Sequence, residues 1–153
     1  MLQADVIFQS YLDRMGQATM DGDFATYEKG VALPFNLSTE TEEIIVSDRA
    51  ELRKGFDDFY KTLQSQHVTD FVRTLTAHEA RGDDLILGLY ETNLLSDGKR
   101  VLPPWKSVMA LARVDTGWRA CWIRNNMGGR RWPLPRPFSE SVSLDSLKQQ
   151  EDS

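Results

Sequence analysis

Hydrophobic positions repeat every three to four residues in three stretches of the N-terminal half, a period typical of amphipathic helices. The first stretch covers residues 4–20, and a shorter one carries Phe24 and Tyr27 and ends near Gly30. The third covers residues 48–66 and has one apolar stripe, formed by Leu52, Phe56, Phe59, Tyr60 and Leu63. This half of the chain therefore predicts two long helices and one short helix.

Alternating or β-branched hydrophobic positions predict strands in the rest of the chain. Two short strands are expected between the second and third helices, over residues 31–37 and 44–46. Four longer strands are expected over residues 68–80, 85–95, 105–114 and 118–126. Tight-turn signals precede the last two of these: Asp97-Gly98 and Asp115-Thr116-Gly117. Helices followed by consecutive antiparallel strands indicate an α+β fold.

Chain length and composition predict one domain followed by an extended arm. The chain has 153 residues, 41% of them hydrophobic, which suits a single domain with its own core. The composition changes near the C-terminus, where Gly128 and Gly129 are followed by three prolines within residues 133–137. We therefore expect a domain over residues 1–127 and an extended, Pro- and Arg-containing arm and tail over residues 128–153.

Charge and cysteine content narrow the classes of partner and compartment. The net charge of −5 disfavours nucleic acid as a partner. No segment approaches the ~20 apolar residues that cross a bilayer, so no membrane partner is expected. The single cysteine, Cys121, fits a reducing compartment, and we expect a cytoplasmic protein. Two isolated histidines and one cysteine give no metal-ligand spacing, so no metal is expected. No other cofactor is expected either.

The order of elements resembles the NTF2-like superfamily, and within it the SnoaL-like proteins, over roughly residues 4–127. Three sequence features carry this resemblance: Asp21-Gly22-Asp23-Phe24 after the first helix, Ser47 to Leu52 at the entry to the long helix, and the two hairpin signals. The resemblance implies a cystatin-like α+β cone, in which a curved antiparallel sheet wraps around three N-terminal helices. In many members the open end of the cone holds a small hydrophobic molecule.

Catalytic residues of two enzyme types within this superfamily are not matched. The positions of the ketosteroid isomerase residues fall near Met15, near Phe35 or Asn36, and near Ala110, none of which is an acid or a tyrosine. The dehydratases of the superfamily use two histidines and an aspartate, a pattern that His67 and His78 match poorly. The resemblance therefore implies the fold without steroid isomerase chemistry.

Alternation along the strands, combined with the resemblance, gives candidate residues for the cone. The expected ligand-binding residues are Tyr11, Tyr27, Phe35, Tyr90, Trp118, Trp122, Arg124 and Asn126, and His78 is a weak candidate for a catalytic base. Each of these residues could instead have a purely structural role. The aromatic residues are also suited to a core, Arg124 to a solvent-facing sheet end, Asn126 to a strand cap, and His78 to the surface.

These expectations lead to three alternative functions. The first is a SnoaL-like protein that binds a small apolar or acidic molecule. The second is a cofactor-free isomerase, cyclase, dehydratase or hydrolase, which requires an ionisable group inside the cone. The third is a non-catalytic protein-interaction module whose cone is filled by side chains.

The outer face of the sheet is expected to mediate assembly. Alternation places Leu85, Leu87, Leu89, Met109 and Leu111 on this face. Because a face this apolar is unfavourable in water, we expect a homodimer through it. The alternative is that the C-terminal arm covers it.

Overall fold

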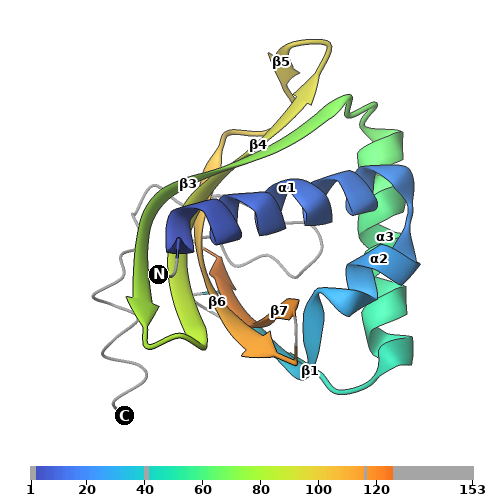
Figure 1. Cartoon of the computed structure of the whole chain (residues 1–153). Helices are drawn as coiled ribbons and strands as arrows, with labels where there is room; N and C mark the ends of the chain where they lie inside the picture. Colours follow the sequence, from blue (N-terminus) through green and yellow to red (C-terminus); the bar gives the residue numbers. More distant parts are fainter. Residues whose placement is uncertain (1–2, 40–41, 116, 126–153) are drawn as a thin grey trace.

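The structure, a computed structural model, describes residues 3–39, 42–115 and 117–125 and has three helices and a curved sheet (Figure 1). The helices are α1 (Ala4–Asp21), α2 (Phe24–Lys29) and α3 (Arg49–Ser65). Asp23 and Asp48 cap α2 and α3, because each carboxylate accepts a hydrogen bond from a backbone N–H of the first turn. The predicted helices are therefore confirmed, and their observed boundaries lie within one or two residues of the predicted ones.

The seven strands form one sheet. They are β1 (Val31–Ser38), β2 (Glu43–Val46), β3 (Asp70–Arg81), β4 (Leu85–Ser96), β5 (Lys99–Arg100), β6 (Trp105–Val114) and β7 (Gly117–Asn125). Their order is β2-β1-β7-β6-β4-β3, and the two-residue β5 pairs with β4 outside this path. β1 and β7 pair in parallel, while the other pairs are antiparallel. The expected α+β cone is confirmed, but its sheet is mixed rather than wholly antiparallel.

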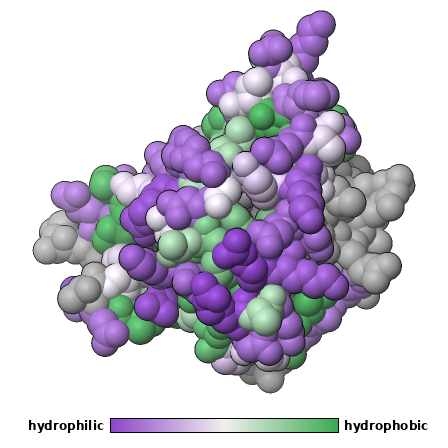
Figure 2. Space-filling model, turned by 90° about the vertical axis from the view of Figure 1, so that its right-hand side faces the viewer, coloured by the Kyte–Doolittle hydropathy of each residue, from purple (hydrophilic) through white to green (hydrophobic). Residues whose placement is uncertain are grey.

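The helices cover the concave face of the sheet. α1 crosses β3 and β4, whereas α3 stands at the end of α1 and turns its outer side to solvent (Figure 1). That side of the molecule is largely hydrophilic (Figure 2). Within the described residues, no helix combines the length and the apolar composition needed to cross a bilayer.

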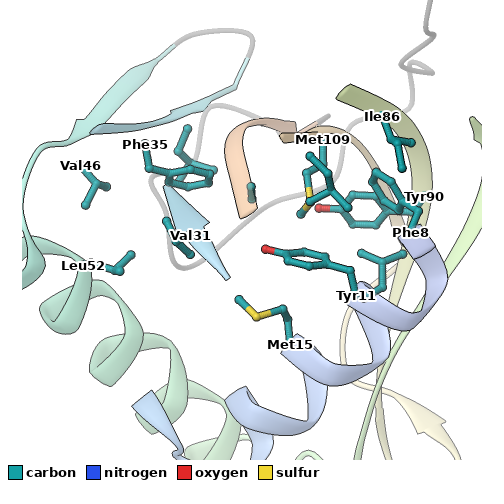
Figure 3. Packing of buried hydrophobic residues seen from close by; sticks show 14 of the residues in the cluster. Phe8, Tyr11, Met15, Val31, Phe35, Val46, Leu52, Ile86, Tyr90 and Met109 are labelled. Atoms are coloured by element: carbon teal, nitrogen blue, oxygen red, sulfur yellow. The ribbon is translucent and has the colours of Figure 1, made fainter. Parts of the chain in front are cut away.

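The main core fills the space between α1 and the sheet. Phe8, Tyr11 and Met15 of α1 pack with Tyr90 and Met109 of the sheet (Figure 3). Gly88 of β4 makes room for α1, because a Cβ at this position would overlap the Phe8 ring. The close approach of α1 to β4 therefore depends on this glycine.

A second cluster lies on the opposite face of the sheet. Leu87, Val108 and Ala110 form its buried centre, and Leu85, Leu89, Cys121 and Trp122 pack against them. The sequence prediction for this face is wrong for Met109 and Leu111, which belong to the main core. The registers Gly88↔Met109 and Ile86↔Leu111 place these two residues beside the concave-facing residues of β4. Directly opposed residues share a face, so both point towards α1.

Candidate functional site

The cone contains a partly open cavity of about 100 Å³ between the helices and the concave face of the sheet. Its wall is mainly aromatic and aliphatic, and side chains from all three helices and from β1, β3, β4, β6 and β7 contribute to it. Val31 and Phe35 line it from β1, and Met15 lines it from α1 (Figure 3). A concave, mainly apolar space with a small number of polar groups is typical of small-molecule sites.

Arg73 of β3 is the one charged side chain among the described residues that line the cavity. Its Nη2 donates a hydrogen bond to the Leu12 carbonyl oxygen of α1 at 3.0 Å. Its guanidinium carbon lies 4.9 Å from the centre of the Phe71 ring and 5.8 Å from that of the Tyr90 ring. These contacts hold the guanidinium in one orientation at the cavity wall.

Three tyrosines surround the same region. The Tyr11 hydroxyl donates to the Gly30 carbonyl oxygen at 2.7 Å. Burial raises the pKa of Tyr11 well above its ordinary value, and it raises the pKa of Tyr27 to about 12. Burial also raises the pKa of Tyr90, while the positive charge of Arg73 and hydrogen bonds with Ser107 and Arg73 act in the opposite direction. All three phenols are therefore neutral donors or acceptors near neutral pH.

A row of polar side chains crosses the concave face beside Arg73. Tyr90 pairs in register with Ser107, and Ser107 pairs with Asn125, so the three lie on neighbouring strands. The Ser107 hydroxyl donates to the Asn125 side-chain oxygen. The hydroxyls of Tyr11 and Tyr90 point to the same side, towards Val31 and Phe35 (Figure 3). The sheet thus presents a stripe of polar groups to the cavity, opposite the hydroxyl of Tyr11 on α1.

Four of the eight residues expected in the cone line this cavity. These are Tyr11, Tyr27, Phe35 and Tyr90. Trp118 packs at the edge of the main core and does not line the cavity. Asn126 lies outside the described residues, and so does the segment over residues 128–153 for which an arm is expected.

The predictions that Trp122 and Arg124 face the cone are wrong, and a β-bulge is the reason. Ala110 pairs with Trp122, but the next residue of β6, Leu111, pairs with Ala120, so Cys121 is an extra residue in β7. One inserted residue reverses the alternation that follows it. Trp122 therefore packs in the outer cluster, and Arg124 pairs with Val108 of that cluster. Ile123 and Asn125 take the concave positions instead and line the cavity.

His78 also lies outside the cavity. It is exposed on β3 and pairs in register with Gly88, beyond the residues that line the wall. Thr76 forms a second bulge, between Leu75 and Ala77, which changes the side on which the later residues of β3 lie. Neither histidine, nor any Asp or Glu, is among the described lining residues.

Sequence reasoning missed Arg73, Ser107 and Asn125. A signal for Arg73 was present, because Phe71, Arg73 and Leu75 alternate with Val72 and Thr74, which puts an arginine on the apolar side of a strand. No comparable signal marks Ser107 or Asn125, since their positions depend on the pairing of β4, β6 and β7.

Metal ligands are not grouped in the described part of the chain. No cluster of three or more His, Cys, Asp or Glu side chains in residues 3–39, 42–115 and 117–125 has a geometry that could hold a metal ion. Cys121 is half-buried, and burial raises the pKa of its thiol. Its thiol donates to the Ala110 carbonyl oxygen on the outer side of the sheet.

Comparison with known proteins identifies the fold. No protein-family model matches the chain, and neither does any curated protein sequence. Similar solved structures include a domain of unknown function with a cystatin-like fold from Nostoc punctiforme PCC 73102, 14% identical, with a TM-score of 0.65 over 99% of this chain and 95% of that one. An NTF2-like protein of unknown function from Shewanella oneidensis MR-1 is 12% identical, with a TM-score of 0.58 over 82% of this chain and 98% of its own. An NTF2-like protein from Cytophaga hutchinsonii ATCC 33406 is 11% identical, with a TM-score of 0.59 over 82% of this chain and 98% of that one. The chain therefore has the cystatin-like fold of NTF2-like proteins.

Proposed function

We propose that this chain is a SnoaL-like protein of the NTF2-like superfamily that binds a small, mainly apolar molecule inside its cone. The cavity of about 100 Å³ under α1 carries this proposal. A dry cavity of roughly 150 Å³ holds benzene in a well-studied engineered protein. The space here is smaller than that cavity, which favours one small ring or a branched alkyl group over a steroid-sized molecule.

The residues of the cavity favour binding over proton-transfer chemistry. An isomerase, cyclase, dehydratase or hydrolase of this type needs a general base near its substrate. The described lining residues include no Asp, Glu or His, and the raised pKa values of the tyrosines keep their phenols protonated. A pure interaction module is less favoured as well, because its cone would be filled rather than hollow.

The proposal is tested by filling the cavity from β7. Ile123 lines the cavity, whereas the next residue, Arg124, pairs with the outer cluster. We expect Ile123→Trp to abolish binding of small one-ring and branched alkyl probes, detected by ligand-observed NMR, because the indole occupies the space the probe needs. Arg124→Trp is the matched control and should bind as the wild type does.

Two outcomes would contradict this function. One is that no probe of the series binds the wild-type protein. The other is that Ile123→Trp, shown to be folded by circular dichroism, binds the probes with unchanged affinity, which would put their site outside the cone.

A further inference from the structure

Arg73 carries a positive charge that no described carboxylate balances. The three ion pairs between described residues join Arg49 to Glu28, Arg53 to Asp57 and Arg81 to Glu79, all at the surface or half-buried. Arg73 takes part in none of them, although it lies against the cavity beneath α1. A partly buried charge is costly unless an opposite charge or hydrogen-bond acceptors compensate it.

The hydrogen-bonding capacity of Arg73 is also incompletely used. A guanidinium has five N–H donors in a planar fork. The Leu12 carbonyl accepts from Nη2, and Tyr90 interacts with the same guanidinium. The Nε atom is buried and has no hydrogen-bond partner among the described residues. The Nε donor therefore lacks an acceptor among the described residues.

A purely structural role explains only part of this arrangement. The bond to the Leu12 carbonyl ties β3 to α1, and a neutral donor would do this without burying a charge. The stacking against Phe71 and Tyr90 adds stability but no acceptor for Nε. Both the uncompensated charge and the free donor are accounted for if an anion binds beside them.

We infer that Arg73 binds the carboxylate of a small monoanionic ligand whose apolar body fills the cavity. This inference rests on the proposed binding function and specifies the class of ligand. A carboxylate matches the fork of a guanidinium and can accept two of its N–H groups at once. A phosphate group carries closer to two charges at neutral pH, and no second cation is among the described lining residues. The apolar wall and the small volume limit the body to one ring or a branched alkyl chain.

The inference is tested first on the wild-type protein with matched acid and amide probes. Benzoate and benzamide have nearly the same shape, as do isobutyrate and isobutyramide, but only the acids are anionic. We expect each acid to bind about 10- to 100-fold more tightly than its amide in calorimetric titration, which is the range of one hydrogen bond to a charged group. The NMR resonance of the Arg73 Nε–H group should shift on titration with the acids.

A pair of variants then assigns the preference to this residue. Arg73→Met keeps an apolar side chain of similar length but removes the charge, and it should bring benzoate binding to the level of benzamide. Arg124→Met removes an arginine from the opposite face of β7 and should leave the preference for the acid unchanged. The wild-type comparison still decides the question if Arg73→Met does not fold.

The outcomes separate this inference from the function on which it rests. Amides that bind as tightly as the acids, in a manner that Ile123→Trp abolishes, would overturn the carboxylate ligand and leave binding in the cone intact. A preference for acids that persists in folded Arg73→Met would overturn the role of Arg73. Failure of acids, amides and hydrocarbon probes alike to bind would contradict the proposed function itself.

Discussion

Single ionisable side chains decide what this cavity can do. Tyr90 lies beside a guanidinium, and burial keeps the phenols of Tyr27 and Tyr90 protonated far into the alkaline range. A protonated phenol donates a hydrogen bond to an oxyanion but does not remove a proton from carbon. These phenols are therefore suited to donating hydrogen bonds to the anionic ligand inferred above.

The tyrosines also predict how stability depends on pH. The pKa of Tyr27 rises from its ordinary value of about 10 to about 12 in the folded protein, because burial and the neighbouring Tyr90 outweigh the charge of Arg73. Between these values the folded chain keeps a proton that the unfolded chain has lost. The stabilisation is complete below about pH 10 and is lost as the pH rises through about 12.

We expect the ionisation of Tyr27 to lower the free energy of unfolding by roughly 1–3 kcal/mol over this pH range. Urea unfolding at about pH 9 and about pH 11 measures it, and Tyr27→Phe should show a shallower fall over the same window. An identical pH dependence in the two proteins would contradict the assignment to this phenol.

At the scale of elements, two bulges and one glycine shape the cone. The bulges at Thr76 and Cys121 change which side chains of β3 and β7 face α1. Gly88 lets the Phe8 ring lie directly against β4. The wall of the cavity is thus set by local departures from regular strand geometry, as is common beside binding sites.

Gly88→Ala tests the contact between α1 and β4. The added methyl group would overlap the Phe8 ring, so we expect a loss of about 1–3 kcal/mol in the free energy of unfolding. Gly117, at the start of β7, has open space around its Cβ position, and Gly117→Ala is the matched control, with an effect within about 0.5 kcal/mol. Equal urea midpoints for the two variants would show that Phe8 moves aside without cost.

At the scale of the whole molecule, the sheet has two apolar faces with different roles. The concave face forms the core and the cavity with the helices. The outer face carries the cluster centred on Leu87, Val108 and Ala110, next to the half-buried Leu85 and Trp122. We propose that a second copy of the chain packs against the part of this outer face that is not already buried, at Leu85, Leu89 and Trp122.

Sedimentation velocity tests the homodimer. For a two-fold assembly, the molar mass fitted to the sedimentation data should be twice the 17.5 kDa mass of the chain. Leu89→Glu, a change on the outer face, should shift the protein towards monomer, because it places a charge in an apolar contact. A concentration-independent monomer for the wild type would contradict the dimer.

The kind and order of the helices and strands can be predicted from the sequence, because their periodicity, caps and turns depend on residues close together in the chain. α3, for example, follows from one apolar stripe and a cap at Asp48. Tyr11 and Tyr27 were also within reach of sequence reasoning, because helix periodicity fixes their faces.

Which strand residues face the cone depends on the tertiary structure and could not be predicted from the sequence. Strand register is set by pairing between distant segments, and a shift of one residue exchanges the two faces. The bulge at Cys121 therefore moved Trp122 and Arg124 out of the expected site and brought Ile123 and Asn125 into it. Arg73 was visible in the sequence as a charge among apolar residues. The packing of α1 over β3 places this charge beside the cavity, where no described carboxylate pairs with it.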